Sequence, residues 1–360
     1  MLPETMHAVL LTGHGGFDKL KYRDDVPVPR PAAGEVLIRI GAAGVNNTDI
    51  NTRVGWYSKA VHGATDDSAA GATGSDDDAS WGGSALQLPR IQGIDVCGRI
   101  VAVGAGVEAA RIGQRVLVSP CLREPGSGIA AARFFGSECD GGFAQYCVAP
   151  SHDSLAIDSA LDDIELASFP CAYSTAENML HRARLAAGER VLITGASGGV
   201  GSAAVQLARR RGAEVIAVAG AAKHAEVAAL GAAELLDRGA DPLAALGADS
   251  VDVVVDLVAG TGWPRLLEVL RRGGRYAVAG AIAGPLVELD LRTLYLKDLT
   301  LFGCTVQDEL VFENLISYIE RGEIRPLVAR HYPLADIVAA QRDFLAKTYT
   351  GKLVLVPPAD

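Results

Sequence analysis

The sequence predicts an α/β protein in which a doubly wound parallel sheet accompanies a second, mostly antiparallel β domain. Three observations lead to this fold class. A glycine cluster joins an apolar strand to an amphipathic helix within residues 191–211, and strands then alternate with helices up to residue 304. Residues 1–150 carry only short strand-like runs. Alternating strands and helices with short turns imply right-handed crossovers between parallel strands.

The glycine cluster is typical of a turn that binds a dinucleotide. Val191, Leu192 and Ile193 form a buried-strand pattern, and the following helix repeats small or apolar residues on one face. Glycines at the junction allow a tight turn and a close approach of backbone N–H groups to a pyrophosphate at the helix N-terminus. We expect cofactor contacts here and at the ends of later strands, from Gly195, Ser197, Gly198, Gly199, Val200, Gly201, Val258, Gly280, Ala281 and Ile282.

The end of the second predicted strand bears on which dinucleotide binds. Enzymes that use NAD usually place an acidic residue about 20 residues after the glycines, where it holds the ribose 2′-hydroxyl. Here Gly220 is followed by small residues and Lys223, and no carboxylate precedes Glu226. The pattern favours NADP(H), with Gly220 and Lys223 near the 2′-phosphate. The alternative is a solvated first-turn lysine and an unselective cofactor site.

The remaining elements follow from hydrophobic periodicity. Beyond the glycine loop we expect helices at 221–230 and 263–271, and strands at 215–219, 234–236, 251–258, 275–279 and 299–304. In the first part of the chain, glycine, proline and aspartate separate strand-like runs, which is typical of an antiparallel β domain. These runs are residues 7–11, 35–40, 98–103, 115–119 and 142–149.

Residues 59–87 differ in amino-acid composition from the rest of the first domain. They are rich in Ala, Gly, Ser, Thr and Asp, and they include Asp66-Asp67 and Asp76-Asp77-Asp78. Such a segment has little apolar surface with which to offset the entropy of ordering. We expect a flexible insertion, either a tolerated surface loop or a lid over the active site.

Composition excludes several classes of function. A net charge of −10 argues against nucleic acid or an anionic membrane as a partner. Residues 1–10 lack a basic segment followed by an apolar core, and no apolar run is long enough to cross a bilayer, so we expect a cytoplasmic protein. The six cysteines contain no Cys-x-x-Cys pair, which argues against a disulfide framework and a structural zinc site.

Several short motifs follow one another in a familiar order. They are Ala43-Gly44-Val45-Asn46-Asn47-Thr48-Asp49, Gly93-Ile94-Asp95-Val96-Cys97-Gly98, Val103-Gly104-Ala105-Gly106-Val107, Gly113-Gln114-Arg115-Val116, the glycine loop, and Gly351-Lys352-Leu353-Val354-Leu355. In order and spacing the chain resembles the medium-chain dehydrogenase/reductase superfamily, and within it the zinc-independent quinone oxidoreductases. The resemblance implies a GroES-like catalytic domain of residues 1–155 and 309–360, interrupted by a Rossmann-type NADP(H)-binding domain of residues 156–308.

The resemblance also bears on metal binding. Zinc-dependent alcohol dehydrogenases of this superfamily hold their catalytic zinc with three residues, and this chain places Asn46, Ile94 and Cys171 at those positions. A lone thiolate does not suffice, because catalytic zinc normally has three protein ligands. The lobe that binds structural zinc in those enzymes is replaced by residues 120–142, which contain only Cys121 and Cys139. We therefore expect no zinc.

Without zinc, the resemblance implies hydride transfer from NADPH to an acceptor that is already electrophilic, a quinone or an α,β-unsaturated carbonyl compound. Neutral donors suffice to stabilise the oxygen that develops charge. The resemblance places Asn46, Thr48 and Tyr57 in the substrate pocket, and Asn51 replaces the relay histidine of the alcohol dehydrogenases. Each has a structural alternative, an asparagine that satisfies a turn or a ring in the core. Asp49 is expected to brace its loop or to pair with Arg53.

Three further expectations follow from the resemblance. Thr175 would lie beside the nicotinamide ribose, and Lys352 would reach the pyrophosphate unless it is an ordinary strand-end lysine. The strand at 299–305 would form the sheet edge through which two copies make a homodimer. Two other functions stay open: a zinc-free NADP-dependent alcohol or carbonyl dehydrogenase of a biosynthetic pathway, and an NADPH-binding protein with little turnover.

Overall fold

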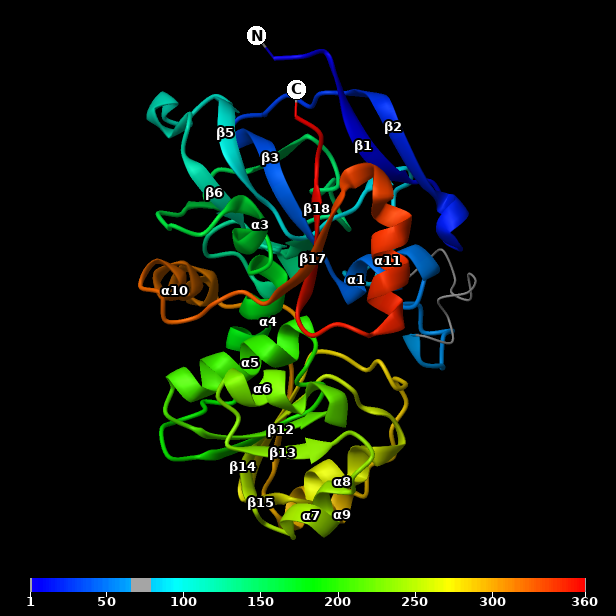
Figure 1. Ribbon diagram of the computed structural model, residues 1–360, viewed down its shortest axis with the longest axis vertical. Helices are drawn as coiled ribbons and strands as arrows, with labels where there is room; N and C mark the ends of the chain where they lie inside the picture. Colours follow the sequence, from blue (N-terminus) through cyan, green and yellow to red (C-terminus); the bar gives the residue numbers. More distant parts are fainter. Residues whose placement is uncertain (1, 66–78, 360) are drawn as a thin grey trace. The chain divides into compact units, whose positions relative to one another are not determined.

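In the computed structural model, which describes residues 2–65 and 79–359, the chain forms two compact units (Figure 1). Unit 1 consists of Met1–Val61, Ser68–Cys171 and Phe312–Asp360, and unit 2 of His62–Asp67 and Ala172–Val311. The main part of unit 2 begins after Cys171, whereas the expected boundary is residue 155; between the two, helix α3 (Asp163–Leu166) packs on the strands of unit 1. Among the described residues, no helix is long and apolar enough to cross a membrane.

Unit 2 is built on a six-stranded sheet whose strands all pair in parallel, in the order β13-β12-β11-β14-β15-β16. This confirms the predicted doubly wound sheet, with the strand near residue 300 at its edge. The chain order reverses between β11 and β14, and such a switch point is where open parallel sheets bind ligands. The strands are β11 (Arg190–Ile193), β12 (Glu214–Ala219), β13 (Glu234–Asp237), β14 (Val251–Asp256), β15 (Leu270–Val278) and β16 (Thr300–Gly303).

Helices cover both faces of this sheet. Figure 1 shows α5 and α6 on one side of the strands and α7, α8 and α9 on the other. The helix predicted to reach Arg271 ends at Glu268, since Leu270 is buried and pairs with Val251 as the first residue of β15. The helices of unit 2 are α5 (Gly199–Arg210), α6 (His224–Ala229), α7 (Pro242–Leu246), α8 (Trp263–Glu268) and α9 (Leu291–Leu296), and α4 (Pro170–Arg182) leads into it.

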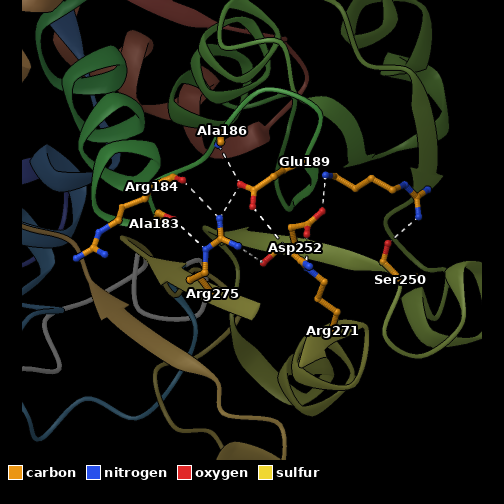
Figure 2. A network of polar contacts seen from close by, with 9 residues as sticks. Ala183, Arg184, Ala186, Glu189, Ser250, Asp252, Arg271 and Arg275 are labelled. Atoms are coloured by element: carbon orange, nitrogen blue, oxygen red, sulfur yellow. Dashed lines mark hydrogen bonds and ion pairs between the residues drawn. The ribbon is translucent and has the colours of Figure 1, made fainter. Parts of the chain in front are cut away.

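A network of charges ties together the amino ends of the parallel strands, the end opposite to the glycine loop (Figure 2). Arg275 Nη2 donates to Glu189 at 2.6 Å. Arg275 Nε donates at 3.0 Å to the carbonyl oxygen of Ala183, the residue that follows α4 in the chain. Arg271 pairs with Asp252 and lies 3.6 Å from Glu189. Burial alone would raise the pKa of Glu189, but the Arg275 hydrogen bond and nearby arginine charges outweigh it and lower that pKa. We call this group the amino-edge network.

Unit 1 contains the mostly antiparallel β domain that the sequence predicted, in which only the pairing of β17 with β18 is parallel among the described strands. Its main sheet has the order β10-β6-β5-β3-β18-β17, with β9 also paired to β3, and a smaller sheet has the order β2-β1-β4. The C-terminal strands return to this unit, where β18 pairs with β3. The strands are β1 (Thr5–Leu11), β2 (Leu20–Pro27), β3 (Glu35–Val45), β4 (Arg90–Ile91), β5 (Cys97–Val103), β6 (Arg115–Val118), β7 (Cys121–Leu122), β8 (Arg133–Phe134), β9 (Tyr146–Pro150), β10 (Ser154–Ala156), β17 (Val328–Pro333) and β18 (Lys352–Val356).

Three longer helices accompany these strands: α1 (Asn47–Val54), α10 (Glu309–Glu320) and α11 (Ile337–Ala346). The strand predicted to begin at Gly142 begins at Tyr146, since the Gly142 and Phe143 N–H groups bond to the carbonyls of Gly93 and Gln92 instead. Residues 66–78 of the expected insertion lie outside the described residues. The part after them, from residue 79 to 87, contributes Leu86 to the hydrophobic core of unit 1.

Candidate active site

The carboxyl ends of the parallel strands in unit 2 carry most of the predicted cofactor-binding residues. Gly195, Ser197 and Gly198 connect β11 to the first residue of α5, Gly199. Gly195 has a φ of +60°, and a Cβ on Gly201 would lie 2.2 Å from the Gly195 carbonyl oxygen, so both positions require glycine. This tight turn leaves the N-terminus of α5 open to a phosphate group, and it fits a dinucleotide. At the same sheet edge lie Val200, Gly220, Val258, Gly280, Ala281 and Ile282.

Asp256, which the sequence reasoning missed, organises this edge. Its fully buried carboxylate accepts hydrogen bonds from the hydroxyl groups of Thr194 and Tyr276, each at 2.6 Å, and from the Val258 N–H at 3.0 Å. Thr194 Oγ1 in turn accepts from the Leu257 N–H at 2.9 Å. One carboxylate therefore joins the ends of β11, β14 and β15. The available signal was an acidic residue directly after the apolar run Val253-Val254-Val255, at the end of a strand.

Two basic residues belong to the segments that meet at Gly220. Lys223 ends a 3₁₀ turn, η4 (Ala221–Lys223), directly after β12. Arg238 is exposed after the neighbouring strand β13, and its Cδ lies 4.0 Å from where a Cβ on Gly220 would be. Asp237 is occupied with backbone, because it accepts from the N–H groups of Ala221 (3.0 Å) and Gly239 (2.9 Å). Arg238 was missed because it follows a different strand from the glycine loop.

A buried ion pair lies inside unit 1. Lys352 Nζ donates to Asp95 Oδ2 at 2.8 Å and to Asn46 Oδ1, and the two charged side chains are 3% and 0% exposed. Asn46 Nδ2 donates back to Asp95 at 2.7 Å and to the Gly44 carbonyl at 3.3 Å. We call Lys352 and Asp95 the buried pair. Both the oxygen and the nitrogen of the Asn46 amide already have hydrogen-bond partners, so the substrate contact expected of Asn46 stays a prediction.

Asp49 braces the turn that leads into α1, as one of the two sequence alternatives expected. Its buried carboxylate accepts the Asn46 N–H at 2.7 Å. Burial raises the pKa of Asp49 to about 7; the Asn46 N–H opposes this shift, the Asp95 charge adds to it, and the Lys352 charge opposes it. Arg53 binds elsewhere, to Gln341 and to the Gly15 carbonyl.

Polar side chains on α1 form a hydrogen-bonded chain with Tyr57. The Tyr57 hydroxyl donates to Thr48 Oγ1 at 2.9 Å, and the Asn51 amide also bonds to the phenol. Asn51 Oδ1 accepts from Asn47 Nδ2 at 3.2 Å. Burial raises the pKa of Tyr57, so the phenol stays protonated at neutral pH. Since Thr48 accepts from Tyr57, its own proton remains to be donated to another oxygen.

The residues at the three zinc-ligand positions do not fit zinc. Asn46 is held by the ion pair, Ile94 is aliphatic and buried, and the Cys171 N–H donates to Asp95 Oδ1 at 2.6 Å. Over residues 2–65 and 79–359, no group of three His, Cys, Asp or Glu side chains could hold a metal ion.

Two expected cofactor contacts come from elements other than the glycine loop and the carboxyl ends of the parallel strands. Thr175 is half-buried in α4 of unit 2. Lys352 opens β18 of unit 1 and is committed to Asp95 and Asn46. The ribose contact of Thr175 and the pyrophosphate contact of Lys352 therefore stay predictions.

Comparison with known proteins identifies the family. The family model of the alcohol dehydrogenase GroES-like domain matches residues 32–159, and that of zinc-binding dehydrogenases matches residues 199–321. The quinone oxidoreductase of Lama guanicoe is 31% identical over 98% of this chain and 97% of its own. The chain belongs to the medium-chain dehydrogenase/reductase superfamily.

Other members of the superfamily are similar over the whole chain. A structure from Sinorhizobium meliloti 1021, provisionally described as an alcohol dehydrogenase, is 50% identical with a TM-score of 0.88, covering 99% of this chain and 98% of that one. The chloroplastic NADPH-dependent alkenal/one oxidoreductase of Arabidopsis thaliana is 27% identical over 99% of this chain and 81% of its own. This chain is an NAD(P)-dependent oxidoreductase of the quinone oxidoreductase type.

Proposed function

We propose that this chain is a zinc-independent, NADPH-dependent reductase of quinones or α,β-unsaturated carbonyl compounds. The observation that carries the proposal is the bond from Tyr57 to Thr48, which leaves a neutral hydroxyl with a proton to donate. The positions that would hold zinc contain the Asn46 amide, which is bound to the ion pair, the aliphatic Ile94 and the single thiol of Cys171. The names of the quinone and alkenal/one oxidoreductases that resemble the chain support the same substrate class.

The residues that would hold the cofactor and those that would hold the substrate have different roles in the proposed reaction. The glycine loop and the N-terminus of α5 would hold the pyrophosphate of NADPH, which when bound supplies a hydride. An enone accepts the hydride at its β-carbon, where a C–H bond forms. The electron pair of the C=C bond shifts to form the double bond of an enolate, and the π pair of the C=O bond moves onto the carbonyl oxygen. Thr48 donates a hydrogen bond to that oxygen, and Tyr57 supports Thr48. Water then protonates the α-carbon and is released as hydroxide, the carbonyl re-forms, and the products are the saturated ketone, NADP⁺ and hydroxide.

The Asn51 amide favours this reaction over the reduction of simple carbonyl compounds. Reduction of a simple carbonyl creates an alkoxide, which must receive a proton at oxygen. A histidine can relay such a proton, whereas an amide neither gains nor loses a proton near neutral pH. An enolate needs only a hydrogen bond at oxygen, which Thr48 provides. The alcohol dehydrogenase alternative is favoured mainly by the description of the Sinorhizobium structure.

The preference for NADPH rests on the basic residues near Gly220. Lys223 and Arg238 can form charge-assisted hydrogen bonds with a 2′-phosphate. Asp237, the acidic residue of this edge, is occupied with backbone N–H groups. Replacing both basic residues with alanine should raise the KM for NADPH by about tenfold or more and leave the KM for NADH unchanged. Equal KM changes for both cofactors would contradict the proposed preference.

The decisive experiment compares Thr48 variants in the reduction of a quinone and an enone. Thr48→Ala should lower kcat about a hundredfold, because it removes the only hydroxyl donor assigned to the substrate oxygen. Thr48→Ser, which keeps the hydroxyl, is the matched control and should retain most activity. Wild-type activity in Thr48→Ala, or failure of the serine variant to restore it, would overturn the assignment.

A second copy of the chain is the proposed protein partner. β16 is an edge strand, and the exposed apolar side chains of α9 and β16 include Leu291, Tyr295, Leu296 and Leu301. Pairing through this edge would cover both the open strand and the apolar side chains. Leu301→Lys should convert a dimer to a monomer in sedimentation experiments. A wild-type chain that sediments as a monomer would contradict the proposal.

A further inference from the structure

The end of the predicted insertion is anchored in unit 1. Ala79 and Ser80 are buried, and Leu86 packs in the core. Between them, the Trp81 N–H donates to Ser137 Oγ at 3.2 Å and the Gly82 N–H donates to Glu138 Oε1 at 2.7 Å. Glu138 Oε2 also accepts from the Phe134 N–H at 2.8 Å. These bonds fix the backbone that carries the Trp81 ring.

The Trp81 ring lies parallel to two other rings. Its centroid is 4.5 Å from that of Phe134, with 11° between the planes, and 6.4 Å from that of Tyr57, with 10° between the planes. Trp56 meets Tyr57 edge-on, at 5.8 Å and 74°. The Tyr57 ring is therefore held by stacked and edge contacts, the two arrangements that aromatic pairs prefer. The phenol itself is held by Asn51 and donates to Thr48.

We propose that Trp81 is a positioning residue, which holds the Tyr57 ring where its hydroxyl donates to Thr48. This inference rests on the proposed function, because a displaced phenol matters through the hydrogen bond that Thr48 gives to the substrate oxygen. Without the donor from Tyr57, the Thr48 hydroxyl can turn its proton toward other acceptors. Residues 79–87, which carry Trp81, then help to position the Tyr57–Thr48 hydrogen bond.

The test is a double-mutant cycle between Trp81 and Tyr57. Trp81→Ala should lower kcat for an enone about tenfold and leave the KM for NADPH unchanged, because the stacking on Tyr57 is lost. Trp81→Phe keeps a stacking ring and should stay within about twofold of the wild type. In a Tyr57→Phe background, Trp81→Ala should cause no further loss, because the hydroxyl through which Trp81 acts is absent. An equal loss in both backgrounds, or no loss in either, would overturn the proposal.

A readout without turnover separates this inference from the proposed function. Raman spectroscopy reports whether a phenol donates a hydrogen bond, through the intensity ratio of the tyrosine Fermi doublet, and subtraction of the matching Tyr57→Phe protein isolates the Tyr57 signal. Trp81→Ala should shift this ratio away from that of a donating phenol, and Trp81→Phe should not, because only the first removes the ring stacked on Tyr57. An unchanged ratio in Trp81→Ala would refute the positioning role. A wild-type protein that reduces no quinone or enone would refute the proposed function, whatever the Raman ratio shows.

Discussion

The buried pair of unit 1 and the amino-edge network of unit 2 both neutralise charged side chains that are shielded from water, but they differ in exposure and in the number of partners. Arg275 and Glu189 are 17% and 18% exposed, and each has several other partners. Lys352 and Asp95 are almost completely enclosed. A network that water reaches and that has spare partners tolerates a lost charge, whereas an enclosed pair does not. The enclosed pair also lies next to the helix that carries Thr48, so its integrity bears on the proposed chemistry.

The largest effect is expected from Lys352→Met. It leaves the Asp95 carboxylate buried without its cation, which should lower the free energy of unfolding by about 3–5 kcal/mol in urea titrations. The double variant Lys352→Met/Asp95→Asn is the matched control, and it should recover part of this loss because the orphaned charge is gone. If the double variant is less stable than Lys352→Met alone, the enclosed charge is not the cause.

A smaller effect is expected from Arg275→Met in the amino-edge network. Glu189 then keeps Arg271 at 3.6 Å, the Ala186 N–H and access to water. We expect a loss of about 2 kcal/mol in the same urea titration, the value of hydrogen bonds to a charged group. A loss as large as that of Lys352→Met would erase the contrast between the two regions.

Asp49, which lies beside the buried pair, should make the stability of unit 1 depend on pH. Its pKa is raised from 3.8 in the unfolded chain to about 7 in the folded protein, so the folded state binds the extra proton between these values. The stability that this proton contributes is complete below the lower pKa and is lost as pH rises through the upper one. Asp49→Asn should therefore be less sensitive to pH than the wild type between pH 4 and 7, as thermal unfolding will show. Parallel pH profiles would contradict the shifted pKa.

Glu189 should change stability with pH in the opposite direction to Asp49, and by the smallest amount of these variants. Its pKa is lowered from 4.5, so its contribution is present at neutral pH and is lost as pH falls through the folded value. Glu189→Gln should melt below the wild type at neutral pH, and the two curves should converge in acid. A difference that persists in acid would mean that the side-chain packing, and not the charge, is responsible.

The sequence patterns predicted the parallel sheet and the glycine loop because both depend on neighbouring residues. Apolar runs mark β11, β12 and β14, and the required glycines at 195 and 201 stand in one short motif. The polar site depends on residues far apart in the chain. A lysine before an apolar strand is expected at the surface, and only the fold brings Lys352 to Asp95 and Asn46.

Trp81 is a second residue whose contacts could not be predicted from the residues near it in the sequence. Its neighbours are small and polar, so composition predicts a flexible insertion around it. Its anchors are Ser137 and Glu138, more than fifty positions away in the sequence, and hydrophobic periodicity carries no sign of them. The signal that was available is a single large aromatic residue in a stretch otherwise without one.

The most direct test of the central claim is NADPH oxidation by an enone after dialysis against a strong chelator. A zinc-independent enone reductase should show a rate unchanged by the chelator. In deuterium oxide, its product should carry deuterium at the α-carbon and a hydride from NADPH at the β-carbon. Loss of the rate on chelation, with recovery when zinc is returned, would contradict the central claim.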